Sequence, residues 1–122
     1  MVGRAVGFGG IFIRSSDPER LQQWYVEHFG LPADEAGAHF DCRDDGGHGR
    51  TVFAVFEADS DYFGSREQAT MVNFRVDDLD AILDRLKAAG VEILPDRQSY
   101  DFGKFAWVVD PDGNRVELWE PV

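Results

Sequence analysis

The sequence contains one cysteine, Cys42, and no apolar stretch near the roughly 20 residues that a helix needs to cross a bilayer. A single cysteine excludes an internal disulfide and any cysteine-rich metal cluster. The N-terminal MVGRAVGFGGIF also lacks the apolar core of a signal peptide. These absences predict a soluble, cytoplasmic protein that is not inserted in a membrane.

Cationic residues are scarce as well. The chain has 12 lysines and arginines against 23 aspartates and glutamates, and its formal net charge is -11 at pH 7. Such a surface repels phosphates, so we expect neither nucleic acid nor an anionic membrane as a partner. It attracts cationic ligands, although an acidic surface that only aids solubility accounts for the same charge.

Two segments show the signals of helices. In the first, Asp17 is a good N-cap, Pro18 suits the first helical position, and Gly30 ends the helix. In the second, Asp77 or Asp78 is the N-cap and Gly90 follows the end. Apolar residues at helical spacing predict one core-facing stripe on each helix. The two stripes are Leu21, Trp24, Tyr25 and Phe29, and Leu79, Ile82, Leu83 and Leu86.

The remaining apolar segments predict strands. They are Val6–Arg14, Ala38–Cys42, Thr51–Ala58, Met71–Val76, Val91–Leu94, Lys104–Val109 and Asn114–Trp119. A turn-rich DDGGHG at Asp44–Gly49 joins the second and third, and a turn with Pro and Gly joins the last two as a hairpin. Asp59–Thr70 is expected to be a connecting loop. Its Tyr62-Phe63 pair is either a lid over a site or an anchor of the linker.

The order of elements is strand, helix and several strands, and then the same again. GIFIRSSD, starting at Gly10, aligns with MVNFRVDD, starting at Met71, at an offset of 61 residues. TVFAVFEA, starting at Thr51, aligns with NRVELWEP, starting at Asn114, at an offset of 63 residues. The 122 residues are therefore expected to form a single domain of two βαβββ modules, at about residues 5–60 and 70–122.

This organisation, with the DPDGN turn, the VELWEP ending and the segment FRVDDLDAILDRLKAAGVEI, resembles the vicinal oxygen chelate superfamily of glyoxalase I, bleomycin resistance proteins and extradiol dioxygenases. The resemblance covers nearly the whole chain. It implies an α+β fold in which the two modules form a cupped mixed sheet, with the helices outside and a ligand site inside. It also implies a homodimer.

Alternation along the strands assigns residues to the concave face of this sheet, called the cup below. On the last strand Glu117 faces the cup, and the hairpin register places Trp107 opposite Glu117 and Phe105 opposite Trp119. The predicted ligand-binding residues are Phe12, Arg14, Phe56, Met71, Asn73, Arg75, Phe105, Trp107, Arg115, Glu117 and Trp119.

Metal-dependent members of the superfamily hold an ion with four side chains, one from each of four cup strands. The resemblance places these positions at Gly10, Ala54, Met71 and Glu117, of which only Glu117 carries a hard donor. One carboxylate does not make a catalytic metal site. The histidines His28, His39 and His48 show no paired spacing. We therefore expect no metal and no cofactor, and metal-dependent glyoxalase or dioxygenase activity is not expected.

The primary hypothesis is a metal-free protein that binds a small molecule, such as an aromatic or antibiotic-like ligand. Three arginines in the cup favour a ligand with an acidic group, unless Arg14, Arg75 and Arg115 only neutralise the nearby Asp77, Asp78, Asp110 and Asp112. Alternatively, the aromatics fill the cup themselves. The alternative function is a glyoxalase-like lyase, isomerase or dioxygenase relative, with Glu117 as general base or residual metal ligand.

Overall fold

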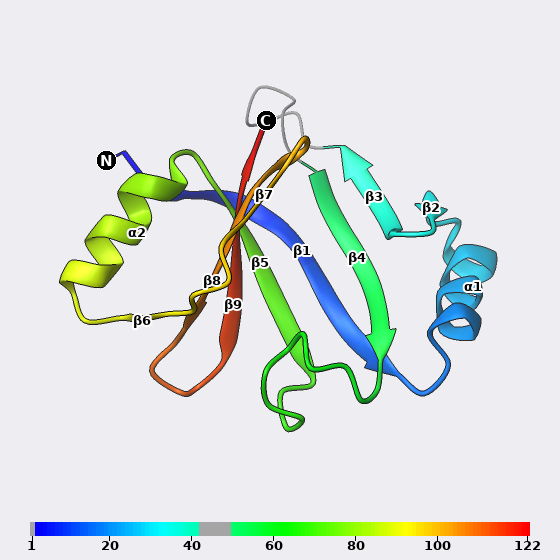
Figure 1. Ribbon diagram of the computed structural model, residues 1–122. Coiled ribbons are helices and arrows are strands. Elements are labelled where there is room, and N and C mark those ends of the chain that lie inside the picture. The colour runs from blue at the N-terminus through cyan, green and yellow to red at the C-terminus, as the bar shows by residue number, and fades with distance from the viewer. Residues whose placement is uncertain (1, 42–49) are drawn as a thin grey trace.

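A computed structural model describes residues 2–41 and 50–122 of the chain. Figure 1 shows a single curved sheet with α1 and α2 at its opposite ends. The predicted α+β class, a cupped mixed sheet with outside helices, is confirmed. No helix among the described residues is long and apolar enough to span a membrane.

The elements of the described residues follow the predicted order closely. The helices are α1 (Pro18–Phe29) and α2 (Leu79–Ala88). The strands are β1 (Ala5–Ser15), β2 (Ala33–Asp34), β3 (Gly37–Asp41), β4 (Arg50–Glu57), β5 (Thr70–Val76), β6 (Glu92–Ile93), β7 (Gln98–Tyr100), β8 (Gly103–Val109) and β9 (Arg115–Pro121). The short β2 and β7 were not predicted. Cys42, His48 and the turn Asp44–Gly49 lie outside the described residues.

The strand order is β2-β3-β4-β1-β5-β9-β8-β6, and β7 pairs with β8. At the centre, β1 and β5 run antiparallel, while β1 pairs in parallel with β4 and β5 in parallel with β9. Phe12 lies opposite Ala54, and Asn73 lies opposite Glu117. These two pairs are related by the offsets of 61 and 63 residues found in the sequence. The two halves of the sheet therefore share one register.

Both helices begin at the predicted aspartates. The Asp17 carboxylate accepts a hydrogen bond from the Arg20 backbone N–H at 3.2 Å. At the other end of α1, Gly30 has a positive φ of 66° and donates its N–H to the Val26 carbonyl, as a glycine C-cap does. The Asp78 carboxylate accepts from the Ala81 N–H at 3.0 Å. These caps satisfy backbone groups that a helix end leaves without partners.

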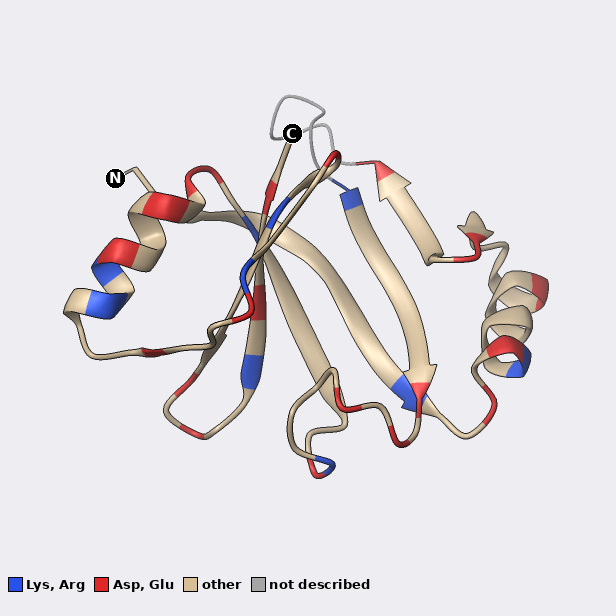
Figure 2. Cartoon of the chain, viewed as in Figure 1, with Lys and Arg blue, Asp and Glu red and all other residues tan. Residues whose placement is uncertain are grey.

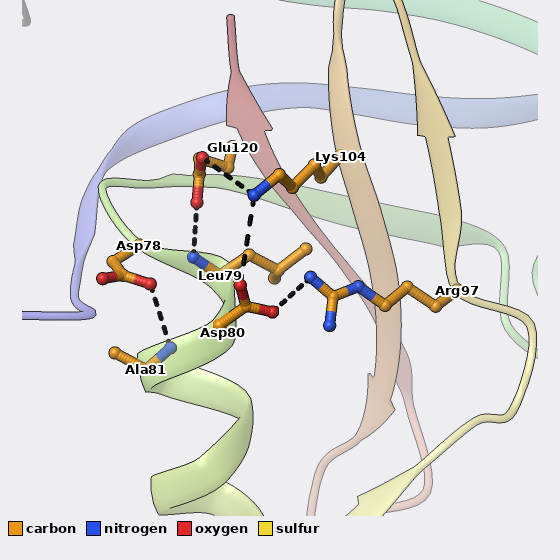
Figure 3. Close-up of polar contacts among 7 residues, drawn as sticks. All are labelled: Asp78, Leu79, Asp80, Ala81, Arg97, Lys104 and Glu120. Carbon is orange, nitrogen blue, oxygen red and sulfur yellow. Dashed lines mark hydrogen bonds and ion pairs between the residues drawn. The ribbon is translucent and has the colours of Figure 1, made fainter.

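The start of α2 is also attached to the sheet (Figure 3). Glu120 of β9 accepts a hydrogen bond from the Leu79 N–H at 2.7 Å, and Lys104 of β8 lies 3.8 Å from the same carboxylate. Asp80 pairs with Arg97, just before β7, and lies 4.0 Å from Lys104. Each exposed pair contributes little to stability. Together they connect the N-terminal turn of α2 to β8, to β9 and to Arg97 before β7.

Two clusters of buried side chains lie on opposite faces of the sheet. The outer cluster, under α2, contains Val76, Leu79, Ile82, Leu83, Ala106, Val108 and Leu118. The cup cluster contains Phe12, Ala54, Phe63, Met71 and Trp107. The prediction for α2 is confirmed for three residues of its stripe, Leu79, Ile82 and Leu83, which are buried.

The prediction for α1 was wrong, because no residue of that helix is buried. Trp24 is 47% exposed and Phe29 is 65% exposed. The apolar stripe exists, but the helix lies at the end of the sheet (Figure 1), where the Tyr25 ring meets Phe53 of β4 edge-on at 4.9 Å. Trp24 contacts both Tyr25 and Phe29, and these three rings form an aromatic cluster on the helix.

Candidate ligand-binding site

A pocket of about 750 Å³ opens in the cup over β8 and β9. Its floor contains Glu117 and Trp107, and its walls contain Tyr62, Phe105 and Arg115. Tyr100 and Phe102, from the β7–β8 hairpin, extend the aromatic surface at the rim. Aromatic walls around a few polar groups are typical of small-molecule sites.

Glu117 is the most deeply buried charged residue of this pocket, with 2% of its surface exposed. The β9 register puts it between Asn73 of β5 and Trp107 of β8, and the second of these pairings was predicted. Its Oε1 accepts a hydrogen bond from the Tyr62 hydroxyl at 2.7 Å. Its Oε2 is buried and has no hydrogen-bond partner among the described residues.

Burial raises the pKa of Glu117 above its ordinary value, because a low-dielectric surrounding disfavours the charged form. The polar groups of Tyr62 and Asn73 act on the pKa of Glu117 in the opposite direction without cancelling this effect. The same burial, together with the charge of Glu117, raises the pKa of Tyr62. Tyr62 therefore stays protonated as a hydrogen-bond donor, while Glu117 can gain or lose a proton.

The segment after β4 closes the other half of the cup. Phe63 is fully buried and belongs with Phe12 and Met71 to the cup cluster, and Phe56 packs against this cluster and meets Phe63 edge-on at 5.4 Å. Tyr62 stacks on Phe56 at 5.2 Å and forms a wall of the pocket. The Tyr62-Phe63 pair therefore fills one half of the cup and borders the other. Predicted ligand-binding residues Phe12, Phe56 and Met71 lie in the filled half.

Arg14 holds this segment in place. Its guanidinium donates hydrogen bonds to four carbonyl groups, those of Ala58, Ser60, Ser65 and Gln68. It also lies 4.4 Å from the centre of the Phe63 ring, in cation–π contact. Arg14 does not line the pocket. Its contacts give it a structural role.

Asn73 and Arg75 belong to β5, and their side chains extend over β1 on the cup face of the sheet. The Arg75 guanidinium donates to the carbonyls of Phe8 and Arg50. A Cβ at Gly7 would collide with the Arg75 side chain, and one at Gly9 would collide with that of Asn73. The glycines of β1 thus provide the space for these two side chains. Neither side chain lines the pocket.

Arg115 is the arginine that reaches the pocket, and it also holds the segment after β4. Its guanidinium donates to the Tyr62 carbonyl at 3.1 Å. Its backbone N–H and carbonyl both bond to the Gln68 side-chain amide, at 2.7 and 2.8 Å. Trp119, two residues beyond Glu117 on the same face of β9, stacks on Phe105 at 5.8 Å and donates its indole N–H to the Phe102 carbonyl.

The charge of the pocket differs from the sequence expectation. Asp61, Asp96 and Glu117 line it together with Arg115. The expected excess of arginines over carboxylates was therefore wrong, because Arg14 and Arg75 bind backbone carbonyls elsewhere. Two of the neighbouring aspartates have other partners among the described residues: Asp77 bonds with Arg4, and Asp110 bonds with Asn114. Figure 2 shows the other acidic residues on the helices, in the turns and near the ends of several strands, while long uncharged stretches run through β1, β4 and β5.

Sequence reasoning missed several residues of the site. Tyr100, Phe102 and Asp96 come from the segment around β7, which was not assigned to a strand. Gln68 was missed because a single glutamine in a loop gives no signal. The aromatic residues of QSYDFG, flanking a tight turn before β8, are the one pattern that could have indicated a hairpin over the cup.

The four positions at which the superfamily's enzymes hold a metal do not fit a divalent ion here. Ala54 and Met71 offer no hard donor, and a side chain at Gly10 would collide with the Val52 backbone. No group of three or more His, Cys, Asp or Glu side chains is arranged for a metal within residues 2–41 and 50–122. His28 contacts Trp24 on α1, and His39 lies 3.2 Å from Asp34 at the sheet edge.

The sequence matches the glyoxalase/bleomycin resistance protein/dioxygenase superfamily over residues 7–118. The chain belongs to this superfamily. No protein of curated function matches it. The superfamily is broad in chemistry, so membership establishes the fold and leaves the activity to be argued from the site.

Solved structures with the same fold include methylmalonyl-CoA epimerases. A variant of the Streptomyces coelicolor enzyme, in complex with 2-nitronate-propionyl-CoA, has a TM-score of 0.71 and 19% identity, covering 98% of this chain and 99% of that one. The Mycobacterium tuberculosis epimerase has a TM-score of 0.63 and 19% identity, covering 97% and 89%. A structure described as NAD-dependent benzaldehyde dehydrogenase from Legionella pneumophila has a TM-score of 0.60 and 15% identity, covering 93% and 98%. At these identities the likeness concerns the fold.

The raised pKa of Glu117 predicts a pH-dependent stability. Below the ordinary glutamate pKa of about 4.3 the carboxyl is neutral in both the folded and unfolded states, and its contribution to stability is fully present. This contribution is lost as the pH rises through the higher pKa of the folded state. Glu117→Gln should therefore gain free energy of unfolding relative to wild type between pH 4 and pH 8, measured by urea denaturation.

The exposed Glu92 of β6 provides the control, since Glu92→Gln removes a carboxylate outside the pocket. The free energy of unfolding of Glu92→Gln, relative to wild type, should change less over the same pH range than that of Glu117→Gln. If the difference in free energy of unfolding between wild type and Glu117→Gln stays constant with pH, the raised pKa of the buried Glu117 carboxyl is contradicted.

Proposed function

We propose that this protein binds a small organic molecule in the half of the cup bordered by Tyr62, Trp107 and Glu117, without a metal at the superfamily's metal positions. One observation carries the proposal: the pocket of about 750 Å³ is lined by aromatic rings around the buried carboxyl of Glu117. Such a combination of apolar walls and a few polar groups is typical of small-molecule sites. A buried carboxyl favours a ligand that offers it a hydrogen-bond donor.

The surroundings of Glu117 indicate the chemistry of the ligand. Phe105, Tyr100 and Phe102 present ring surfaces in the same pocket. Three carboxylates against one arginine, which is already bonded to a carbonyl, disfavour an anion. The protein therefore favours an aromatic ligand that is neutral or cationic and carries an N–H donor. Antibiotic-like aromatic amines fit this description.

A matched pair of indoles tests this proposal. We expect tryptamine, which carries an ammonium group, to bind to the wild type, and indole-3-propionate, which carries a carboxylate, to bind more weakly by isothermal titration calorimetry at pH 7.5. Glu117→Gln should weaken tryptamine binding by about tenfold or more, the size of one hydrogen bond to a charged group.

Glu92→Gln is again the matched control and should leave the affinity for tryptamine within twofold of wild type, about 0.4 kcal/mol. A preference for the carboxylate, or tryptamine binding that is insensitive to Glu117→Gln, would overturn the proposed polarity of the pocket.

A second candidate function is proton transfer by Glu117 in an isomerase. Two observations favour it: the raised pKa of a carboxyl that lines the pocket, and the shared fold with methylmalonyl-CoA epimerases. In such a reaction the Glu117 carboxylate takes a proton from the carbon beside a carbonyl, and a proton then returns to that carbon. We rank it second because no histidine lines the pocket among the described residues to serve as the partner acid.

Deuterium exchange separates the two candidates. With methylmalonyl-CoA in D₂O, the binding proposal predicts that the proton signal of the carbon beside the thioester decays at the same rate with wild type and with Glu117→Gln. Faster decay with wild type, followed by ¹H NMR, would show that Glu117 transfers protons and would favour the isomerase.

We also propose that the protein is a homodimer. The outer face of the central strand β1 supports this, because Phe8 is 57% exposed and Ile11 is 46% exposed. Phe8 stacks on Phe74 of β5 at 5.3 Å, so the apolar surface continues onto the neighbouring strand. Contiguous apolar surface of this kind is typical of interfaces, and a two-fold axis lets one patch meet its own copy.

Sedimentation velocity tests the homodimer. We expect the wild type to sediment as a dimer and Ile11→Lys to shift toward monomer, because a charge is introduced at an uncharged contact. Gln23→Lys on the exposed surface of α1 adds the same charge and should leave the dimer intact. A monomeric wild type at high protein concentration would refute the proposal.

A further inference from the structure

Arg115 is the cationic side chain of the pocket lining, and only part of its guanidinium is used by the protein. Its Nη1 donates to the Tyr62 carbonyl at 3.1 Å. Its Nε and Nη2 have no hydrogen-bond partner within residues 2–41 and 50–122, and neither atom is buried. Both nitrogens therefore remain available as donors on the wall of the pocket.

Arg115 also forms no ion pair with any carboxylate in the described part of the chain. The pocket itself offers partners, because Asp61, Asp96 and Glu117 line it as well. A carboxylate that pairs with a guanidinium commonly takes two parallel N–H groups of its fork. Since none does so here, the edge of the guanidinium that carries Nε and Nη2 is left for another acceptor.

The guanidinium is held in place although this edge has no acceptor. The Gln68 side-chain amide bonds to both the backbone N–H and the carbonyl of Arg115, at 2.7 and 2.8 Å. Gly64, which also lines the pocket, lies against the guanidinium: a Cβ there would be 3.0 Å from Nε and 3.2 Å from Nη2. A side chain at this position would therefore crowd the two donors. Donors that are already held in place lose less conformational freedom when a ligand binds.

We propose that Arg115 is a specificity-determining residue that donates to a carbonyl oxygen of the ligand, so that the ligand is an aromatic amine which also carries a carbonyl group. This inference rests on the proposed binding function and adds a second polar contact to it. A neutral carbonyl suits the site better than a carboxylate, because the three carboxylates of the lining repel a further negative charge.

The spacing of Arg115 and Glu117 indicates the shape of the ligand. They lie two positions apart on β9, so both side chains leave the same face of the strand, with Cα atoms roughly 6.6 Å apart. A benzene ring with an aminomethyl group and a carbonyl group in para positions separates the two polar groups by a similar length. Phe105 and Trp107 line the same pocket and offer ring surfaces to the benzene ring.

Two probes that differ in the acceptor test the contact. 4-Acetylbenzylamine carries a carbonyl opposite its aminomethyl group, and 4-isopropylbenzylamine has a group of nearly the same shape without an oxygen. Both are monocations at pH 7.5, so the charges of the pocket act on them alike. The ratio of their dissociation constants, measured by isothermal titration calorimetry, therefore reports the contact made by the carbonyl.

The ratio would be measured for wild type, Arg115→Met, Arg115→Lys and Arg97→Met. Arg115→Met keeps an unbranched side chain without donors, and Arg115→Lys restores the charge and a donor. Arg97 lies outside the pocket lining and pairs with Asp80, so Arg97→Met is the matched control for the loss of one arginine. Circular dichroism and thermal denaturation establish that each variant is folded.

In Arg115→Met we expect the affinity for the acetyl probe, relative to that for the isopropyl probe, to fall about tenfold from the wild-type value, the size of one hydrogen bond to a charged group. Arg115→Lys should recover part of this preference, and Arg97→Met should keep all of it. An Arg115 that only supported the Tyr62 segment would weaken both probes equally in Arg115→Met and leave the ratio unchanged.

The outcomes separate the two proposals. If both probes bind to wild type and weaken in Glu117→Gln, but the ratio is the same in wild type and Arg115→Met, the role of Arg115 is refuted and the binding function stands. If neither probe binds to wild type, or if binding is insensitive to Glu117→Gln, the proposed site itself is refuted, and the role of Arg115 falls with it.

Discussion

The antiparallel pairing of β1 with β5 joins the two halves of the sheet, and the side chains of the cup take their places from its register. Gly10 lies opposite Asn73 in this pairing, and Asn73 lies opposite Glu117 on β9, which in turn lies opposite Trp107 on β8. The glycines at this part of β1 allow the longer side chains of β5 to cross it. A row of paired residues across four strands thus sets the positions of Glu117 and Trp107 in the pocket.

The segment between β4 and β5 breaks the symmetry of the two modules. Arg14 gathers four carbonyl groups of this segment, which otherwise would need water or other donors, and Phe63 enters the cup beneath them. One half of the cup is then part of the hydrophobic core. The other half keeps its volume, and Tyr62 stands at the boundary between the two. A fold built from a repeated unit therefore presents a single-sided site.

The charge of that pocket depends on which arginines bind backbone carbonyls outside it. Arg14 and Arg75 satisfy backbone carbonyls, and this leaves the pocket with more carboxylates than cations. Glu117 is costly to ionise in such a place, and the Tyr62 hydroxyl offsets part of the cost. The same arrangement supports binding of a hydrogen-bond donor and, as the second candidate, removal of a proton from carbon.

The sequence by itself determined the α+β fold, both helix starts, and the register that pairs Trp107 with Glu117 and Phe105 with Trp119. These features depend on local caps, on alternation and on a repeat, all of which are written in neighbouring residues. Only the tertiary structure decided that Phe63 fills half of the cup, that Gln68 holds Arg115, and that two arginines face carbonyls instead of a ligand. Such contacts join residues 25 to 67 positions apart in the sequence, and no local pattern specifies which carbonyl a guanidinium will meet.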